Sequence, residues 1–262
     1  MKLSIYQIDA FTEKVFGGNP ACVVPLNNWL EDNILLKIAQ ENAVAETAFF
    51  IKKKNFYHLR WFTPEIEMDL CGHATLASSY VIKNYIDLSR NEILFKTLSG
   101  ELKVFIENDF FTLDFPSRMP KKIVLPNLLK KSINLFPQKV LKSRDFFLVY
   151  KSQKEIEDIS INTEIFNKIN LSPGGVIVSA PGESSDFVSR FFTPQASIME
   201  DPVTGSAHCS LIPYWSSILN KKEMTAIQLS KRKGKLYCTN KKKRVLIKGK
   251  AKIYCVGNIW IS

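Results

Sequence analysis

The sequence lacks the features that mark secreted and membrane-spanning chains. Its five cysteines are odd in number and show no C-x-x-C spacing, which argues against a disulfide framework and against a structural zinc site. No apolar run approaches the roughly 18 residues that a membrane helix needs. The first nine residues interrupt apolar side chains with polar ones, so they predict a strand rather than a secretory signal. We therefore expect a cytoplasmic protein with no membrane partner.

The composition favours a folded protein with a bias toward anions. The chain has 262 residues, 45% of them hydrophobic, which suffices for one large or two medium domains. The net charge of +11 is partly concentrated in two late basic runs, residues 231–235 and 241–244. Such runs are typical of solvated turns between strands, and these lack the regularly placed aromatic residues of a single-strand stacking platform. We expect small anionic molecules, not nucleic acid, as partners.

The chain contains a weak internal duplication. Residues 60–64 read Arg-Trp-Phe-Thr-Pro and residues 190–194 read Arg-Phe-Phe-Thr-Pro, an offset of 130. A second echo joins residues 100–104 to residues 234–238 at an offset of 134. Prolines at 116, 120 and 126 favour an extended connector near the middle of the chain. The pattern predicts two similar domains, 1–118 and 119–262.

Periodicity predicts the same order of elements in both halves, with strands dominating. In the first half we expect strands near 2–9, 46–52, 57–63, 92–97, 101–107 and 110–115, and helices near 32–42 and 73–84. In the second half we expect strands near 146–151, 175–180, 187–193, 226–230, 236–239 and 244–256, and helices near 163–169 and 206–219. Pro213 is expected to interrupt and kink the last of these helices.

In each half a loop of small residues leads into a helix. The sequences are Cys-Gly-His-Ala-Thr at 71–75 and Asp-Pro-Val-Thr-Gly-Ser-Ala at 201–207. The unpaired N–H groups at a helix N-terminus, with the positive end of the helix dipole, form a ready anion site, and glycine permits close approach of a ligand. If the two helix starts face each other across a domain cleft, they would hold a substrate carboxylate.

Single residues of these patterns have ordinary interpretations as well. Asn19 lies in Gly-Gly-Asn-Pro, which by itself is typical of a plain turn. Glu46 begins an apolar strand, and by itself it is typical of an ordinary exposed carboxylate at the end of a strand. His73 would be a helix-capping or core histidine on its own. The motifs therefore carry more information together than apart.

Taken together, four motifs resemble the successive signatures of the phenazine-biosynthesis (PhzF-like) isomerases, which have the diaminopimelate epimerase-like fold. They are Phe-Gly-Gly-Asn-Pro at 16–20, Ala-Glu-Thr-Ala-Phe-Phe at 45–50, Phe-Thr-Pro at 62–64 with Gly-His-Ala-Thr at 72–75, and Glu-Asp-Pro-Val-Thr-Gly-Ser-Ala at 200–207. The resemblance implies an α+β fold of two similar domains, each an antiparallel sheet curled around a central helix. It implies pseudo-two-fold symmetry between the domains and an active site between them.

The resemblance also implies a reaction. In the family, a proton moves on dihydro-3-hydroxyanthranilate and shifts a double bond without cofactor or metal, and members are often homodimers. Carried over by residue, the acid/base group is Glu46, and the positions that bind and polarise the substrate are His73, Asp201, Ser206, Asn19, Gly72 and Gly205. The duplication offset carries Glu46 to Ile177, where no carboxylate stands, so only one half would supply a base.

Two other functions remain open at this stage. A racemase or epimerase of the diaminopimelate type uses two thiols from opposite faces of the substrate, and Cys71 lies at the place of one of them. The second helix start has Pro202 and Val203 where the partner thiol is expected, with Cys209 further on, which disfavours this mechanism. The third possibility is a non-catalytic anion-binding protein that has kept the fold.

Overall fold

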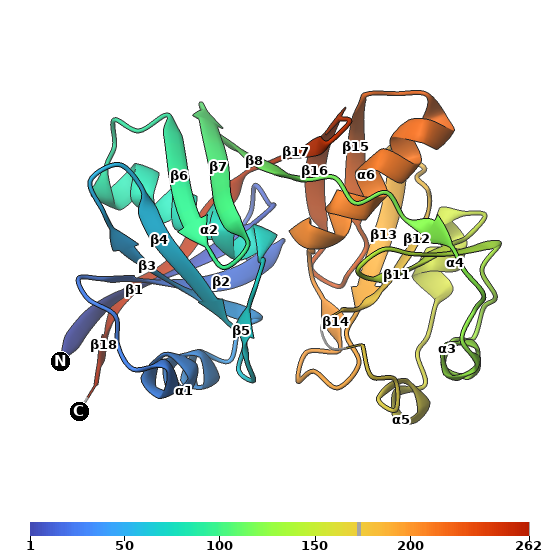
Figure 1. Cartoon of the computed structure of the whole chain (residues 1–262), viewed down its shortest axis with the longest axis horizontal. Coiled ribbons are helices and arrows are strands. Elements are labelled where there is room, and N and C mark those ends of the chain that lie inside the picture. The colour runs from blue at the N-terminus through green and yellow to red at the C-terminus, as the bar shows by residue number, and fades with distance from the viewer. Residues whose placement is uncertain (172–173, 262) are drawn as a thin grey trace. The chain divides into compact units, whose positions relative to one another are not determined.

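A computed structural model describes residues 1–171 and 174–261, which form two compact units. The first unit contains residues 1–115 and the C-terminal segment that starts at Leu246, and the second spans Pro116–Val245. The C-terminal segment joins the first unit because β18 (Ala251–Trp260) pairs antiparallel with β1 (Lys2–Ala10) (Figure 1). The expected second domain, 119–262, is therefore wrong at its C-terminal end, although the chain leaves the first unit close to the expected boundary.

The first unit is built on a mixed sheet with the strand order β18-β1-β2-β3-β4-β6-β7-β8. The remaining strands are β2 (Asn19–Leu26), β3 (Glu46–Lys52), β4 (Tyr57–Phe62), β6 (Glu92–Thr97), β7 (Gly100–Glu107) and β8 (Phe110–Pro116), with the short β5 (Glu67–Met68) on β4. Two pairings, β2–β3 and β4–β6, are parallel. The sheet of the expected α+β fold is thus mainly antiparallel but mixed, because a helix connects each of these two pairs and returns the chain in the same direction.

The second unit repeats this arrangement. Its strand order is β9-β10-β11-β12-β13-β15-β16, and the pairings β11–β12 and β13–β15 are parallel. The strands are β9 (Lys121–Lys122), β10 (Lys139–Lys142), β11 (Phe146–Val149), β12 (Val176–Pro181), β13 (Phe187–Phe192), β15 (Glu223–Gln228) and β16 (Gly234–Lys241), with the short β14 (Glu200–Asp201) on β13. β17 (Arg244–Gly249) follows β16, begins in this unit and ends in the first, where it pairs with β8. The shared order of strands and crossovers is what the sequence duplication predicts.

One helix is central to each unit. In the first, α2 (Gly72–Val81) is buried along almost its whole length, and a π-helical turn (Ile82–Ile86) continues it. In the second, α6 (Gly205–Leu219) is buried from its start through Trp215. Figure 1 shows α2 and α6 each among the strands of its own unit. A helix that is apolar around its circumference requires such a surrounding sheet, and its first turn is thereby fixed.

Shorter helices cover the other faces of the sheets. α1 (Asp32–Asn42) packs Leu35 and Ile38 against Phe49 of β3 in one apolar cluster. In the second unit α3 (Asn127–Ser132), α4 (Gln153–Asp158) and α5 (Thr163–Phe166) contribute to a second cluster with β11, β12 and β13. Strands such as β3 and β12 are therefore buried on both faces and form continuous apolar runs.

Several expected elements differ from the structure. The single strand expected at 244–256 is two strands, β17 and β18, which separate at Lys250. The helix expected at 163–169 is the single turn α5, whereas β9, β10, α3 and α4 were not predicted. These elements are short, and short segments carry little periodicity.

Pro213 does not interrupt α6, which is helical on both sides of it. A proline has no N–H to donate to the carbonyl four residues earlier, here that of Cys209. The backbone N–H of Arg118, in the connector, donates to this carbonyl at 2.8 Å instead. The helix continues through Pro213 because another segment of the same unit satisfies the group that the proline leaves open.

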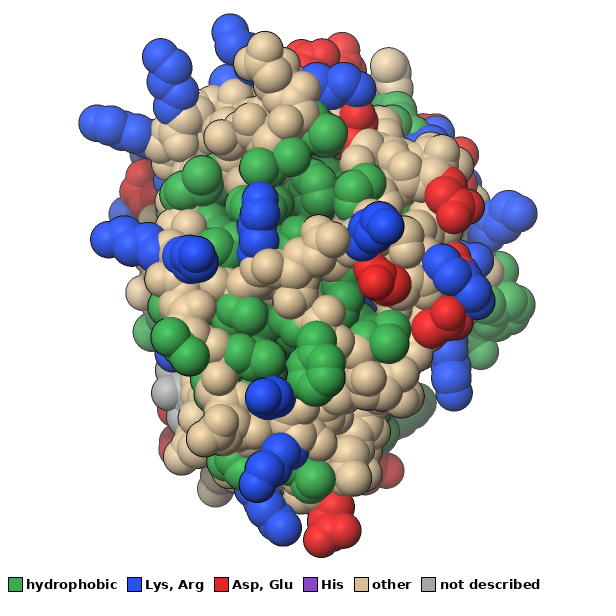
Figure 2. Space-filling view, turned by 90° about the vertical axis from the view of Figure 1, so that its right-hand side faces the viewer, with side chains coloured by type: hydrophobic (Ala, Val, Ile, Leu, Met, Phe, Trp, Pro, Cys, Tyr) green, Lys and Arg blue, Asp and Glu red, His purple; other side chains and the backbone are tan. Residues whose placement is uncertain are grey.

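Two clusters of cationic residues lie at turns, and further ones follow the start of the second unit. The two late basic runs form the turns that follow β15 and β16, where Lys233 and Lys242 have positive φ, as expected for solvated turns. Residues 116–144 also contain lysines and arginines and no acidic residue. Figure 2 shows one face on which hydrophobic side chains lie between Lys and Arg side chains. Within the described residues no helix is both long and apolar enough to cross a membrane.

Candidate active site

The candidate site of the first unit begins with the loop before β2. Gly18 has φ of +61°, and a Cβ at this position would lie 2.0 Å from the carbonyl oxygen of Ala10, so only glycine fits. The backbone N–H of Phe16 donates to the Asp9 carboxylate at 2.8 Å and secures the same loop. Asn19 then enters β2 fully buried. It is therefore an interior residue, not one on an exposed turn.

Asn19, Glu46 and His73 come together at the start of α2. Nδ1 of His73 lies 3.0 Å from Nδ2 of Asn19, and Nε2 lies 3.1 Å from Oε2 of Glu46. The His73 side chain is 2% exposed and the Glu46 side chain 14%. The Glu46 contact has ion-pair distance without hydrogen-bond alignment, and neither atom has an aligned partner among the described residues. The carboxylate thus faces the imidazole at a position with partial access to solvent.

Cys71 completes this cluster. It precedes Gly72 as the N-cap residue of α2, and its Sγ lies 3.5 Å from Nδ1 of His73. The thiol, the imidazole and the carboxylate offer ligand atoms that all lie within 4.8 Å of one another. The Cys71 side chain makes no capping hydrogen bond of ordinary geometry, although the Ala74 backbone N–H in the first turn of α2 is close enough to favour its thiolate.

The electrostatics of the cluster distinguish the imidazole from the thiol. Burial opposes the charged form of His73, but the negative charge of Glu46 at 3.1 Å favours it, and the pKa of His73 lies well above its ordinary value; Cys71 adds to this only as a thiolate. Burial raises the pKa of Cys71 to about 11, and the charge of Glu46 adds to this effect. Cys71 is therefore a thiol at neutral pH, and thiols are poor nucleophiles and bases.

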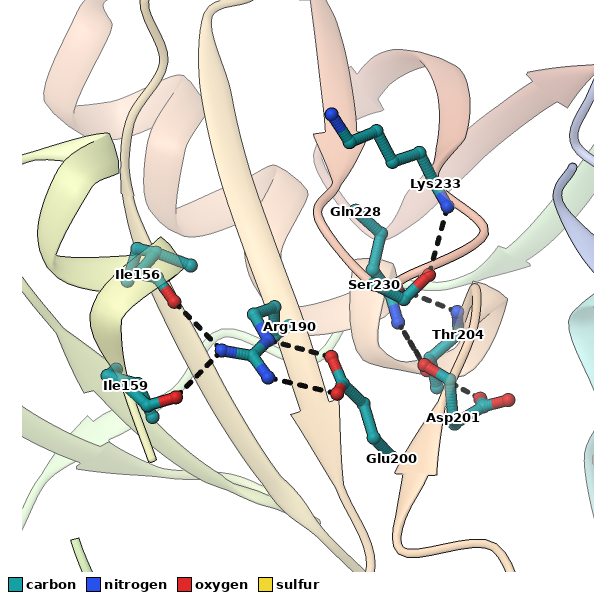
Figure 3. Close-up of polar contacts among 9 residues, drawn as sticks. All are labelled: Ile156, Ile159, Arg190, Glu200, Asp201, Thr204, Gln228, Ser230 and Lys233. Atoms are coloured by element: carbon teal, nitrogen blue, oxygen red, sulfur yellow. Dashed lines mark hydrogen bonds and ion pairs between the residues drawn. The ribbon is translucent and has the colours of Figure 1, made fainter. Parts of the chain in front are cut away.

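The second unit holds its own polar cluster before α6 (Figure 3). The Thr204 hydroxyl donates to Oδ2 of Asp201 at 2.5 Å. Gln228, which is buried at the end of β15, accepts from the Thr204 N–H at 2.8 Å and donates to the Asp201 carbonyl at 2.7 Å. These hydrogen bonds fix the segment from Asp201 to Gly205. Ser206 follows it, partly exposed in the first turn of α6.

A second interaction in Figure 3 has a duplicate in the other unit. Arg190 on β13 holds Glu200 through two hydrogen bonds of 2.7 and 2.9 Å. Arg60 on β4 holds Glu67 in the same way, at 2.7 and 2.6 Å. Bidentate Arg–carboxylate pairs fix both position and orientation. Each pair therefore fastens the short strand that leads to its helix, and explains why the arginine recurs in both motifs.

The strand registers identify which residues correspond between the units. Phe62 pairs with Thr47 and Phe192 with Val176, so the counterpart of Glu46 is Gly175, not Ile177. A Cβ on Gly175 would lie 2.3 Å from Cζ of Phe191, which explains the glycine. The position that lacks a carboxylate in the second unit is therefore Gly175, whereas the duplication offset had placed it at Ile177. Only the first unit has a glutamate at this position.

The helix starts correspond as well. Cys71 and Thr204 are the N-cap residues of α2 and α6, so the counterpart of the Cys71 thiol is the Thr204 hydroxyl. The expectation that Pro202 or Val203 stands there is wrong. Cys209 is fully buried inside α6, where burial raises the pKa of its thiol to about 12. The second thiol of a two-thiol mechanism is therefore replaced by a hydroxyl.

The structure thus groups the sequence candidates into two sets. Asn19, Glu46, Gly72 and His73 form one cluster in the first unit. Asp201, Gly205 and Ser206 lie at the start of α6 in the second. Sequence reasoning missed Thr204 and Gln228; the signal for Gln228 was an amide on the same face of its strand as Met224 and Ala226, a face that is buried.

Known proteins resemble this chain over nearly its whole length. A family model described as phenazine biosynthesis-like protein matches residues 8–257. An uncharacterised isomerase of Pseudomonas aeruginosa is 43% identical over 99% of both chains. A crystal structure of a phenazine biosynthesis PhzF-family protein from Enterococcus faecalis superposes with a TM-score of 0.93 at 42% identity, covering all of both chains. A predicted epimerase from P. aeruginosa shares the fold, with a TM-score of 0.76 at 16% identity over 99% of this chain and all of that one.

Proposed function

The chain belongs to the phenazine biosynthesis-like (PhzC-PhzF) family, and from this premise we propose that it is a cofactor-independent isomerase that moves a proton on a small carboxylate-bearing substrate. Its matched relatives include proteins named isomerases, and the fold is the α+β fold of the PhzF-family structures. The proposal adds that Glu46 is the acid/base group. The observation that carries it is the contact of Glu46 with the buried His73, in a chain whose corresponding position holds Gly175.

Removing a proton from carbon requires a base at a fixed position with support for the charge that develops. The Glu46 carboxylate takes the proton from the substrate carbon. His73 has Nδ1 3.0 Å from Nδ2 of Asn19, and its Nε2 lies 3.1 Å from the carboxylate, which fixes the position of Glu46. The same carboxyl group then returns the proton to another carbon, and the double bond moves between the two positions.

One base has a stereochemical consequence. A carboxyl group that both removes and returns the proton acts on one face of the substrate, as a double-bond shift allows. Inversion of a stereocentre needs a second group on the opposite face. Cys71 beside His73 is the feature that favours racemase chemistry, but its thiol pKa of about 11 and the Thr204 hydroxyl at the corresponding position argue against a thiol pair.

The substrate carboxylate is proposed to bind at helix N-termini. Neither Cys71 nor Thr204 caps its helix with its side chain, so first-turn N–H groups near Gly72 and Gly205 are available for an anion. Asp201 and Ser206 retain their proposed role in binding polar groups of the substrate. A substrate related to dihydro-3-hydroxyanthranilate, an amino- or hydroxy-acid, meets these requirements.

Proton exchange in deuterated water tests this function. Wild-type protein is incubated with dihydro-3-hydroxyanthranilate and several α-amino acids and followed by NMR. Deuterium uptake with double-bond migration, lost in Glu46→Gln and kept in Glu41→Gln on the exposed face of α1, supports the isomerase. Exchange confined to amino-acid α-carbons would favour the racemase. Anion binding to the protein without exchange in any substrate would favour a non-catalytic role.

A further inference from the structure

The cluster at the start of α2 has a donor set that the isomerase reaction does not require. Glu46, Cys71 and His73 offer a carboxylate oxygen, a thiol sulfur and an imidazole nitrogen within 4.8 Å of one another. These are the three ligand types that bind Zn²⁺ in proteins. The proton shift proposed above uses the carboxylate and the imidazole, and assigns no chemical step to the thiol.

The distances suit a tetrahedral ion after a small adjustment. Zinc bonds of about 2.0–2.3 Å place neighbouring ligand atoms about 3.3–3.8 Å apart. Oε2 of Glu46 lies 3.1 Å from Nε2 of His73, and the largest separation in the cluster is within 4.8 Å. Sγ of Cys71 lies 3.5 Å from Nδ1 of the same ring, so the Cys71 side chain must rotate to place its sulfur about 2.3 Å from an ion bound at Nε2.

The surroundings of His73 favour coordination through Nε2. This atom is buried and lies 3.1 Å from Oε2 of Glu46 without hydrogen-bond alignment among the described residues, so an ion that binds both atoms would replace this contact. The other ring nitrogen, Nδ1, lies 3.0 Å from Nδ2 of Asn19, and a half-turn of the Asn19 carboxamide would present its oxygen to an Nδ1–H instead. Metal-binding histidines donate their second ring N–H to an outer acceptor of this kind.

We infer that Glu46, Cys71 and His73 form a binding site for Zn²⁺ or a similar divalent ion, and that the bound ion inhibits the enzyme. The ion displaces the proton of the Cys71 thiol and any proton on Nε2 of His73, and both leave to solvent. The thiolate, imidazole and carboxylate then occupy three positions, with water in the fourth. The inhibition rests on the proposed function, because the ion binds the Glu46 carboxylate that would move the proton. The binding of the ion does not depend on that function.

Cobalt substitution tests the site without substrate. Co²⁺ takes zinc positions, and a thiolate ligand gives it a charge-transfer band in the near ultraviolet. The wild-type protein is titrated with Co²⁺ under reducing conditions and then with Zn²⁺. We expect one Co²⁺ per chain, a thiolate band, and loss of the band as Zn²⁺ replaces Co²⁺.

The variants locate the ligands. Cys71→Ser is expected to lose the band, whereas Cys255→Ser, which removes the exposed cysteine, retains it. Glu46→Gln retains a thiolate band with affinity lowered by at least about tenfold, since losing a direct ligand costs no less than the loss of an outer one. This variant decides the question if Cys71→Ser does not fold.

Three outcomes would overturn the inference: no band in the wild type at stoichiometric Co²⁺, a band that survives in folded Cys71→Ser, or a band lost in Cys255→Ser. Unchanged Co²⁺ affinity in Glu46→Gln would do the same. Because absorption needs no turnover, a protein that binds Co²⁺ but exchanges no protons contradicts the proposed function alone. A protein that exchanges protons with unaltered rate in saturating Zn²⁺ contradicts the inhibitory role.

Discussion

His208 should make the protein less stable in mild acid. It lies on α6, fully buried, where Nδ1 is 2.8 Å from the Thr204 carbonyl oxygen, to which it donates; Nε2 has no aligned partner among the described residues. Burial lowers the pKa of His208 to about 4, with the Thr204 bond opposing this effect. In the unfolded chain the pKa returns to about 6.5.

The sign and size follow from these two values. Between pH 6.5 and pH 4 the unfolded state binds a proton that the folded state does not, so the free energy of unfolding falls as the pH falls. From pH 7.5 to pH 5.0 this single group removes about 2 kcal/mol. The loss ends below the folded pKa, where both states are protonated.

Urea unfolding of the wild type and His208→Asn at pH 7.5 and pH 5.0 isolates this contribution, because other titrating groups act equally on both proteins. The variant should be less stable at pH 7.5, since asparagine leaves a cavity, but the gap should shrink by about 2 kcal/mol at pH 5.0. His58→Asn is the control; its side chain is less buried, so its gap should change less. A gap for His208→Asn that is equal at the two pH values would refute the reasoning.

Three further substitutions test the local geometry. Gly175→Ala places a Cβ 2.3 Å from Phe191 and should cost about 1–3 kcal/mol in thermal unfolding, whereas Gly257→Ala, with 3.8 Å to its nearest neighbour, should cost less; equal losses would contradict this packing. Gly18→Ala should displace Asn19 and lower the exchange rate in kinetic assays, and wild-type kinetics would exclude that role. Gln228→Ala should remove the partner of the Thr204 N–H, cost about 1–3 kcal/mol and raise KM more than it lowers kcat; an unchanged KM would count against substrate binding at Asp201.

The family, the fold class and the position of the main elements were predictable from the sequence. Long periodic segments such as β7 and α6 carry their own signal, and the Arg-aromatic-Phe-Thr-Pro motif recurs because each arginine holds a glutamate on the next short strand. The match of the family model to residues 8–257 confirms the resemblance. Local patterns sufficed wherever an interaction lies within a few residues of its motif.

Features that depend on distant partners were not predictable. The helix α6 passes through Pro213 because Arg118, far away in the sequence, donates to the open carbonyl. The last strand, β18, joins the first unit through pairing with β1. The counterpart of Glu46 is Gly175 because insertions shift the offset between the halves, which only the strand registers reveal. Each of these depends on tertiary contacts that no local pattern encodes.

The most direct test of the central claim compares the exchange kinetics of Glu46→Gln and Cys71→Ser with those of the wild type, on the substrate that shows uptake. If Glu46 alone moves the proton, kcat/KM in Glu46→Gln should fall on the order of 10²- to 10⁴-fold, while Cys71→Ser stays within about tenfold of the wild type. Both proteins should retain the wild-type circular dichroism spectrum. Equal losses in the two variants would contradict a single carboxylate base and restore the thiol mechanism.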